Sequence, residues 1–323
     1  MSGTSLLERV EHFIEDHTLI DPGSTIIVGL SGGPDSAFLL HSLVGLAHKK
    51  KLTLIAAHLD HQWRETSAND ITFCAQLSAS LGFAFISNTI QELSLPFSQN
   101  GSKEEFGRKA RRFFLEKIAR EYNAQAIALG HHFDDQIETF FIRLIRGTSL
   151  AGLIGIKPKD GLYIRPLLAI KKNEIMEYLT LHDKAYLTDP SNESDEFLRN
   201  RIRASVVPAL RACDQRFDNN FAVSQHHLQQ THEFIQELSA TILKEISDDT
   251  ALFIEPLLSL HLVILHTILM QWLIMHKVPF SPSSGFLDEI IRFLKQPGDA
   301  DHIFYQKWRI TKRNGKATIN SIK

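Results

Sequence analysis

The sequence is poor in the residues that cross-link a chain or hold a metal cluster. It has only two cysteines among 323 residues, Cys74 and Cys213. They are too far apart for a CxxC pair, a zinc knuckle or an iron–sulfur ligand set, and two cysteines make no disulfide framework. Residues 1–13 contain acidic side chains and no long apolar run, so they do not resemble a signal peptide. We therefore predict a protein of the reducing cytoplasm.

Neither charge nor hydropathy marks out one class of partner. The formal net charge is -2, whereas dedicated nucleic-acid binders are often strongly basic. Residues 256–276 contain no Asp, Glu, Lys or Arg, but they do contain His261, His266 and Gln271. Polar side chains at the centre of a bilayer are costly, so this stretch favours a buried helix, and we expect no membrane partner.

Strand and helix signals alternate in the first half of the chain. Short apolar, β-branched runs predict strands at 25–30, 52–59, 83–89 and 126–130. Helical segments lie between and after them, at about 67–82, 102–123 and 134–146. This alternation predicts an α/β fold with a doubly wound, mostly parallel, Rossmann-like sheet. Ligands of such sheets bind beyond the carboxyl ends of the strands.

The pattern changes after Gly161 and predicts a smaller, mainly helical C-terminal domain. We place one domain at 1–215 and a helical linker with a second, C-terminal domain at 216–323. Helices are expected at 172–181, 196–210 and 219–246, with a turn at 189–192. The remainder predicts two helices, then strands at 303–310 and 316–319 around the hairpin turn Asn314-Gly315.

A glycine- and serine-rich turn lies between the first strand and the next helix. It reads Ser31-Gly32-Gly33-Pro34-Asp35-Ser36. Glycines let main-chain N–H groups approach phosphate oxygens, and a new helix adds unpaired N–H groups and a positive dipole end. A plain tight turn capped by Asp35 and Ser36 is the alternative. The chain has neither GxxxxGK[ST] nor GxGxxG, which argues against a Walker loop and a dinucleotide site.

The motif SGGPDS after a strand resembles the PP-loop of ATP pyrophosphatases, and further stretches resemble one family of them, the tRNA(Ile)-lysidine synthases. The resemblance runs from about 24 to 208. It implies that 1–215 is a PP-loop ATP-binding catalytic domain and that 216–323 is a helical linker with a tRNA-binding domain. The stretches are His58–Arg64 with Ser67 and Asp70, Glu105 with Arg108–Arg111, Gly130–Thr139 with Arg143 and Arg146–Thr148, Arg165–Leu168, Asp189–Asn192 and Arg199–Arg203. Arg112 departs from the aromatic residue usual in that family.

The resemblance implies a two-step ligation on tRNA(Ile) with a CAU anticodon. The wobble cytidine is adenylated at C2 by ATP with Mg²⁺, and free L-lysine then displaces AMP to give lysidine. Basic segments at 103–120, 199–216 and 307–323 are candidate RNA contacts, with solubilising surface charge as the alternative. The oligomeric state is left open, a homodimer being one alternative.

The resemblance also implies roles for individual residues. The predicted ATP-binding residues are Ser31, Gly32, Gly33, Pro34, Asp35, Ser36 and His58, with Asp35 also assigned to Mg²⁺. The predicted catalytic residues are Asp35, Arg111, His131, Asp135 and Glu138. The predicted substrate-binding residues are Arg108, Arg111, Arg143, Arg146, Arg199, Asn200 and Arg203.

Each assignment has a structural alternative. Asp135 and Glu138 suit the first turns of a helix, whose dipole favours acids. His58 suits a hydrogen-bonded strand end, and Arg143 with Arg146 suits a solvated helix end. Two rival functions also stay open: another PP-loop tRNA-modifying enzyme, such as a thiolase, although the cysteine pair typical of such thiolases is missing, and a non-catalytic nucleotide- or RNA-binding protein.

Overall fold

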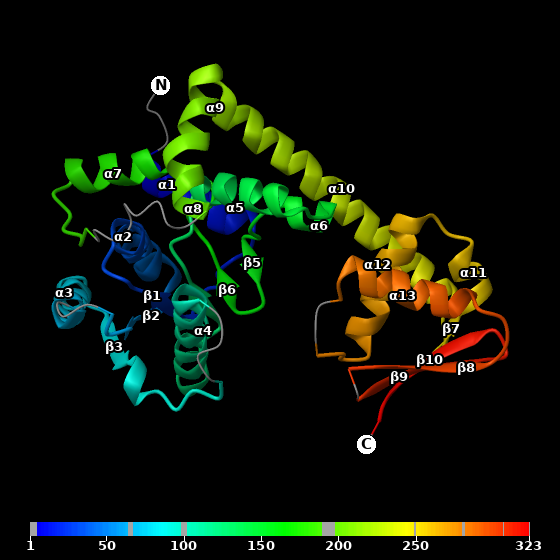
Figure 1. The fold of residues 1–323 in the computed structure, drawn as a ribbon. Coiled ribbons are helices and arrows are strands. Elements are labelled where there is room, and N and C mark those ends of the chain that lie inside the picture. The colour runs from blue at the N-terminus through cyan, green and yellow to red at the C-terminus, as the bar shows by residue number, and fades with distance from the viewer. Residues whose placement is uncertain are drawn as a thin grey trace. The chain divides into compact units, whose positions relative to one another are not determined.

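The computed structural model describes residues 5–63, 67–97, 102–188, 198–248, 250–279, 282–305 and 307–322. The contacts between residues divide the chain into two compact units, Met1–Phe221 and Ala222–Lys323 (Figure 1). This division falls six residues after the predicted boundary, at 221 instead of 215. The two units are described separately below. The predicted turn at 189–192 and the start of the predicted helix 196–210 lie outside the described residues.

The first unit is built on a six-stranded sheet whose order is β3-β2-β1-β4-β6-β5. All neighbouring strands are parallel except β5 and β6. The predicted doubly wound, mostly parallel sheet is therefore confirmed. The strands are β1 (Thr25–Gly29), β2 (Thr53–Asp60), β3 (Ala84–Thr89), β4 (Ala126–Ala128), β5 (Lys159–Asp160) and β6 (Tyr163–Ile164).

The helices predicted at 67–82, 102–123, 134–146 and 172–181 begin and end close to the predicted residues, whereas α1 and α6 were not predicted. The Ser102 hydroxyl accepts a hydrogen bond from Glu105 N at 3.2 Å, which caps the helix predicted there. Gly147 ends another helix with a φ of 73°, as a glycine stop requires. The helices are α1 (Leu6–Asp16), α2 (Pro34–Lys50), α3 (Ser67–Ser80), α4 (Lys103–Glu121), α5 (Phe133–Arg146), α6 (Leu150–Leu153), α7 (Lys172–Leu181), α8 (Leu198–Arg201), a π-helical segment (Ile202–Val206), α9 (Val207–Cys213) and the start of α10 (Phe217–Glu245).

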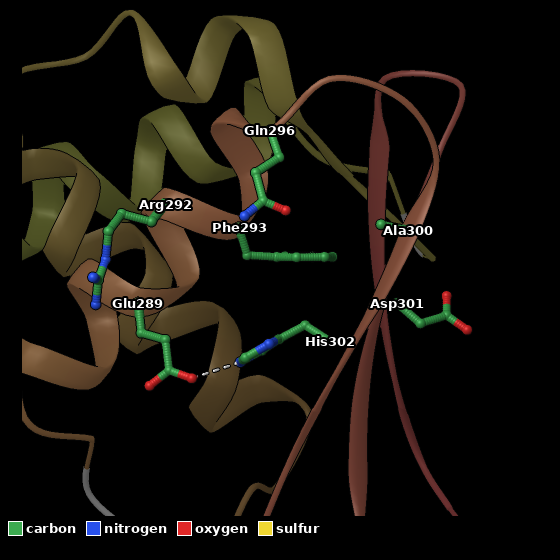
Figure 2. A pocket seen from close by; sticks show the side chains of 7 residues that line it. All are labelled: Glu289, Arg292, Phe293, Gln296, Ala300, Asp301 and His302. Atoms are coloured by element: carbon green, nitrogen blue, oxygen red, sulfur yellow. Dashed lines mark ion pairs between the residues drawn. The ribbon is translucent and has the colours of Figure 1, made fainter.

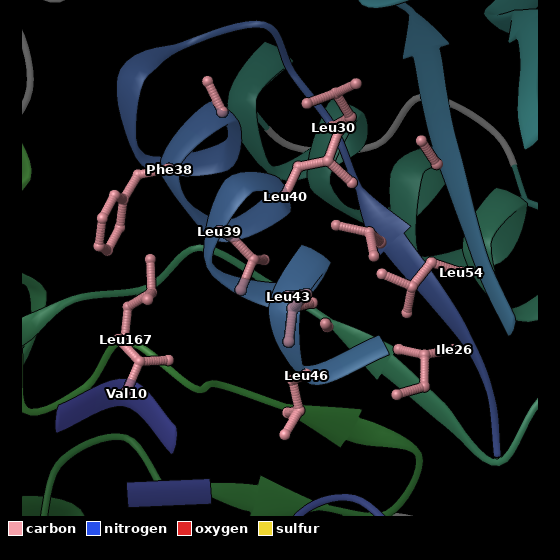
Figure 3. Packing of buried hydrophobic residues seen from close by; sticks show 14 of the residues in the cluster. Val10, Ile26, Leu30, Phe38, Leu39, Leu40, Leu43, Leu46, Leu54 and Leu167 are labelled. Carbon is pink, nitrogen blue, oxygen red and sulfur yellow. The ribbon is translucent and has the colours of Figure 1, made fainter. Parts of the chain in front are cut away.

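Both faces of the sheet are buried, which explains the continuous apolar runs in its strands. On β1, Ile26 and Val28 pack with α1, α2 and α7 in one cluster, and Figure 3 shows α2 filling it with Phe38, Leu43 and neighbouring side chains. Ile27 points to the other face and packs with α4. Each fully buried side chain of this size contributes about 1.5–3 kcal/mol, so this packing fixes α2 on the sheet.

The strand order reverses between β1 and β4. The chain runs from β1 outward to β2 and β3, and then returns to β4 on the other side of β1. The carboxyl ends of β1 and β4 therefore flank the switch point, where doubly wound sheets bind ligands. The Ser31–Ser36 loop follows β1, and His131 follows β4. The topology thus brings two of the predicted site segments together.

The second unit combines helices with a four-stranded antiparallel sheet of order β7-β10-β9-β8. Ile310, Ile319 and Trp272 belong to its buried core. Asn314 and Gly315 have φ values of 50° and 73°, which confirms the predicted hairpin turn. The elements are the rest of α10, α11 (Ile254–Leu258), α12 (Leu262–Met275), α13 (Ser284–Lys295), β7 (Leu252–Phe253), β8 (Ala300–Phe304), β9 (Trp308–Arg313) and β10 (Lys316–Ser321).

Two expectations for this unit are wrong in detail. The single strand predicted at 303–310 is two strands, because β8 ends at Phe304 and Tyr305 takes a φ of 52° that breaks the strand. The apolar stretch at 256–276 is divided between α11 and α12, and α13 makes a third helix where two were expected. Within the described residues, no helix combines the length and apolarity that crossing a membrane requires.

Candidate functional site

The Ser31–Ser36 loop is held in shape by its own serine side chains. The Ser36 hydroxyl accepts from Ser31 N at 3.1 Å and donates to Gly33 O at 3.0 Å. Because its proton is used on Gly33 O, the Ser31 hydroxyl donates to it across a further 3.1 Å contact. The loop is therefore ordered by internal hydrogen bonds before any ligand arrives.

This geometry leaves main-chain donors open at the start of α2. The N–H groups of Gly32, Gly33, Asp35 and Ser36 donate to no acceptor in the described part of the chain. Gly32 has a φ of 82°, and a Cβ there would lie 2.7 Å from Leu187 Cδ1, so glycine is needed at this position. Unpaired N–H groups at a helix N-terminus form an anion site. The loop is suited to phosphate oxygens.

Asp35 lies between two basic side chains. Lys172 Nζ donates to its Oδ1 at 2.5 Å, and His132 Nε2 lies 3.6 Å from its Oδ2. Burial alone would raise the pKa of Asp35, but His132 and Lys172 outweigh that effect and lower the pKa below its usual value. Asp35 is therefore a carboxylate with both oxygens next to cationic groups.

His132 links Asp35 to Asp135 at the start of α5. Burial would lower the pKa of His132, but Asp35 and Asp135 together raise it above its usual value. His132 Nε2 lies 3.6 Å from Asp135 Oδ2, which also accepts from His132 N at 2.9 Å. Oδ1 of Asp135 has no hydrogen-bond partner among the described residues. Asp135 thus keeps one oxygen unpaired within the described residues, and His132 links the carboxylate to Asp35 of the loop.

Three contacts hold this arrangement together, and sequence reasoning missed Ile170 and Lys172 among their residues. A Cβ on Gly130 would lie 3.0 Å from the carbonyl of Asp35, so glycine lets the residues after β4 approach the start of α2 without a shift of the main chain. Phe133 N donates to Ile170 O at 2.8 Å. Lys172 N donates to Asp134 Oδ2 at 2.8 Å. The beginnings of α2, α5 and α7 therefore meet at one point.

A buried ion pair lies one turn beyond Asp135 on α5. Glu138 is 1% exposed, and Arg203 binds both of its oxygens, with Nε at 2.6 Å and NH2 at 3.1 Å. Arg199 Nε lies 3.5 Å from the same carboxylate. Burial raises the pKa of Glu138, and Arg203 opposes that rise. Arg203 is on the π-helical segment, a distortion frequent at functional sites.

His131 is neutral at physiological pH. Burial, with smaller contributions from Arg165 and Arg199, lowers its pKa to about 4 despite the opposing charge of Asp135. Its Nδ1 is buried without a hydrogen-bond partner in the part of the chain that the structure describes. A neutral imidazole with an unpaired nitrogen beside two arginines and a carboxylate suits a polar ligand.

Two further predicted residues, His58 and Arg111, contact the neighbouring strands β1 and β2 and the residues that follow them. His58 Nδ1 donates to Leu30 O at 2.9 Å, so His58 fixes the strand end that precedes the loop. Arg111 NH2 donates to His61 Nε2 at 3.2 Å, and burial followed by the charge of Arg111 lowers the pKa of His61 to about 4. Trp63 stacks on the His61 ring with centroids 4.6 Å apart. Arg111 itself is exposed to solvent.

Residues 4–210 match the sequence model of the PP-loop domain family. This match covers more than half of the chain. The chain belongs to the PP-loop domain family. A PP-loop fold also accounts for the strand order and for the open N–H groups at the start of α2.

Two individual relatives of the chain carry the same enzyme name. The chain is 34% identical over 307 residues to a tRNA(Ile)-lysidine synthase of Bacillus cereus, an alignment that covers 90% of this chain and 64% of that protein. It is 34% identical over 264 residues to the enzyme of the same name from Geobacillus kaustophilus, which covers 79% of this chain and 57% of the relative. The chain thus spans less than two-thirds of the length of these relatives.

A solved structure supports the fold. The U34-tRNA thiolase NcsA of Methanococcus maripaludis superposes with a TM-score of 0.59 and 18% identity, over 69% of this chain and 78% of the thiolase. At this identity the likeness concerns the PP-loop fold alone.

The residues of the PP-loop domain fit a magnesium ion that is also bound by the phosphates of a ligand. Among the described residues, no group of three His, Cys, Asp or Glu side chains is arranged to hold a metal. Asp35 is a single carboxylate, 31% exposed, next to the phosphate loop. Mg²⁺ commonly binds through one or two carboxylates together with substrate phosphates, so Asp35 fits that mode.

The remaining predicted residues are spread more widely. Arg108 is exposed on α4. Arg143 donates to Gly152 O at 2.7 Å and Gly155 O at 3.0 Å, so it holds the turn after α6. Arg143 and exposed Arg146 lie about two and three helical turns beyond Asp135. Asn200 is half-buried on α8. Arg64 lies outside the described residues.

Two cavities lie away from these residues. One, of about 500 Å³, lies against the outer side of α7 at Met176 and Leu181. The other, of about 420 Å³, lies in the second unit between α13 and β8. Figure 2 shows Glu289 and His302 pointing toward each other across it, and their ion pair measures 3.2 Å. Neither cavity is lined by a predicted site residue.

Proposed function

We propose that the protein is a cytoplasmic ligase that uses ATP to join lysine to C2 of the wobble cytidine of tRNA(Ile) with a CAU anticodon. One observation supports this most strongly. The PP-loop is connected through Asp35 and His132 to Asp135, a carboxylate with a free oxygen. A phosphate-binding loop and a proton acceptor thus share one site, as the two halves of the reaction require. The named relatives supply the substrate class.

In the first half-reaction the cytidine C2 oxygen attacks the α-phosphorus of ATP. The bond from that phosphorus to the bridging oxygen breaks, and pyrophosphate leaves. The open N–H groups of Gly32, Gly33 and Ser36 donate to the departing phosphates and stabilise the charge that develops on them. Mg²⁺ held by Asp35 and the phosphates would neutralise part of that charge.

In the second half-reaction the ε-amine of lysine attacks C2, the bond from C2 to its oxygen breaks, and AMP leaves with that oxygen. Lysine has a reference pKa of about 10.4, so its ammonium must lose a proton before it can attack. Asp135 Oδ1 is the proton acceptor in this proposal. His132 holds Asp135 in place through its main-chain N–H.

Glu138 acts indirectly in this scheme. Arg203 occupies both of its oxygens, so Glu138 does not itself take the lysine ammonium. It orients Arg203, whose side chain is 46% exposed and open to an anionic group of a substrate. A guanidinium held in this way can make paired bonds to a phosphate or to the lysine carboxylate.

The tRNA would contact basic surface in both units. Exposed Arg108 and Arg111 lie on α4 beside Trp63, which is 42% exposed. In the second unit, Arg309, Arg313 and Lys316 lie on neighbouring strands. Basic side chains of this kind track a phosphate backbone independently of its sequence. We assign the second unit to tRNA binding on this basis.

Exchange of labelled pyrophosphate into ATP tests the proposal. We expect exchange to require the CAU-anticodon tRNA, because the tRNA base accepts the adenylyl group. Asp35→Ala should abolish exchange with little loss of stability. Asp135→Asn should retain exchange and lose the transfer of lysine. Exchange that proceeds without tRNA would instead indicate a different acceptor, and exchange lost together with folding in Asp35→Ala would indicate a structural role for Asp35.

A further inference from the structure

The PP-loop contains no cationic side chain of its own. Ser31–Ser36 includes neither lysine nor arginine, although the pyrophosphate that leaves from it is strongly anionic. Its only charged residue is Asp35, which repels phosphate. A cation is therefore needed from another segment, and Lys172, 137 residues away in sequence, places its ammonium 2.5 Å from Asp35 Oδ1.

This ammonium group is not needed to hold α7 in position. The start of α7 is already fixed by main-chain donors, with Lys172 N bonded to Asp134 Oδ2 and Phe133 N bonded to Ile170 O. Nor does Asp35 depend on it alone, since His132 lies beside the other carboxylate oxygen. The Nζ group of Lys172 can therefore leave Asp35 without loss of the local fold.

The Lys172–Asp35 contact is also accessible. The side chain of Lys172 is 36% exposed and that of Asp35 is 31% exposed. A partly exposed ion pair of this kind contributes only modestly to stability. It can exchange with an incoming anion, whose charge exceeds that of one carboxylate.

We propose that Lys172 binds the β- and γ-phosphates of ATP and the pyrophosphate that leaves. In the free protein its ammonium neutralises Asp35. When phosphate enters the loop, the ammonium donates to a phosphate oxygen, which releases Asp35. The identity of the nucleotide as ATP rests on the proposed function, whereas the pyrophosphate contact rests on the geometry of Lys172.

Calorimetric titration of the full chain with inorganic pyrophosphate, with AMP and with ATP tests this assignment. Lys172→Met should weaken pyrophosphate and ATP binding by at least about tenfold and leave AMP binding unchanged, because AMP lacks the phosphates concerned. Lys172→Arg should stay within about threefold of the wild type, because the positive charge is kept. Lys171→Met is the matched control: Lys171 pairs with Asp218 at 2.9 Å, away from the loop, and its loss should leave all three affinities unchanged.

Three results would overturn the assignment. They are wild-type pyrophosphate affinity in Lys172→Met, a parallel loss of AMP and pyrophosphate binding in that variant, and an equal loss in Lys171→Met. The second would show a structural role. Transfer of lysine by the wild-type protein is scored separately. If it fails while Lys172→Met selectively loses pyrophosphate binding, the proposed ligation is wrong and the role of Lys172 stands.

Discussion

At the scale of single residues, the site depends on charges that balance one another. His132 lies 3.6 Å from both Asp35 and Asp135, and these two acids keep its pKa above the usual value although burial acts in the opposite direction. The protonation of His132 therefore depends on both Asp35 and Asp135. Changing one acid should change the charge of the histidine.

The pKa of His132 in an Asp35→Asn variant measures this coupling. The substitution removes one negative neighbour while burial remains, so we expect the pKa to fall, which NMR titration of the imidazole carbons would detect. The raised pKa of His132 also makes the stability of the fold depend on pH. A raised histidine pKa stabilises the fold below the unfolded value of about 6.5, and this contribution is lost as pH rises through the folded pKa. An unchanged His132 pKa would contradict the coupling.

Removal of the arginine from the Glu138–Arg203 pair should destabilise the fold. Arg203→Met leaves a carboxylate that is 1% exposed, with Arg199 as its remaining ion-pair partner among the described residues. This should cost about 2–4 kcal/mol of unfolding free energy at pH 7.5. The loss should shrink as pH falls, because a carboxyl whose pKa is raised in the fold binds its proton more tightly when folded. Denaturant unfolding at several pH values measures both effects.

A double variant provides the control for that prediction. In Glu138→Gln/Arg203→Met no carboxylate is left at the position, so the pH-dependent part of the loss should disappear. If Arg203→Met keeps the same deficit from pH 5 to pH 7.5, buried charge is not its cause.

Some of these site residues can be recognised from the sequence alone, and others cannot. The loop residues and Asp135 are recognisable because they form local patterns with a strand before them or a helix after them. The partner of Glu138 is not recognisable in this way, because Arg203 is 65 residues away. Lys172 looks like an ordinary first-turn residue, and only the packing of α7 against α5 brings it to Asp35. Long-range ion pairs of this kind carry no periodic signal.

At the scale of elements, three helix N-termini converge on one point because glycine allows it. Gly130 ends the segment after β4, and the main chain of Asp35 lies against it. The sequence predicts β4 and α2 separately, but the distance between them is a tertiary property. The helices with clear caps were predicted within about two residues. The strand break at Tyr305 was missed because no glycine or proline marks it.

Gly130→Ala tests the close approach. The added Cβ would meet the Asp35 carbonyl at 3.0 Å and Ser36 N at 3.2 Å, so the start of α2 must shift. We expect a loss of about 1–3 kcal/mol in unfolding free energy and a larger fractional loss of pyrophosphate affinity. Calorimetric titration and denaturant unfolding measure these.

Gly45→Ala on the same helix is the matched control. A Cβ there meets nothing within 4 Å, and alanine favours a helix by about 0.5–1 kcal/mol over glycine. This variant should be slightly more stable, with unchanged affinity. If both variants behave alike, the contact between Gly130 and Asp35 does not matter.

At the scale of the whole molecule, the chain consists of a PP-loop domain and a second unit with its own core. Four of the six strands of the first unit were predicted, because strands buried on both faces have continuous apolar runs. The short strands β5 and β6 and the helices α1 and α6 were not predicted. The second was predicted only in part. Its short strands are interrupted by turns, and just one of them, at Asn314-Gly315, has a distinctive sequence.

The central proposal is that the protein joins lysine to the wobble cytidine of tRNA(Ile). The most direct measurement is the transfer of labelled lysine to a transcript of tRNA(Ile) with a CAU anticodon, in the presence of ATP and Mg²⁺. The account predicts label in the RNA at the wobble cytidine, with AMP and pyrophosphate formed in equal amounts, and no label when that cytidine is replaced by uridine. Folded protein that binds ATP and this tRNA but leaves the RNA unlabelled would contradict it.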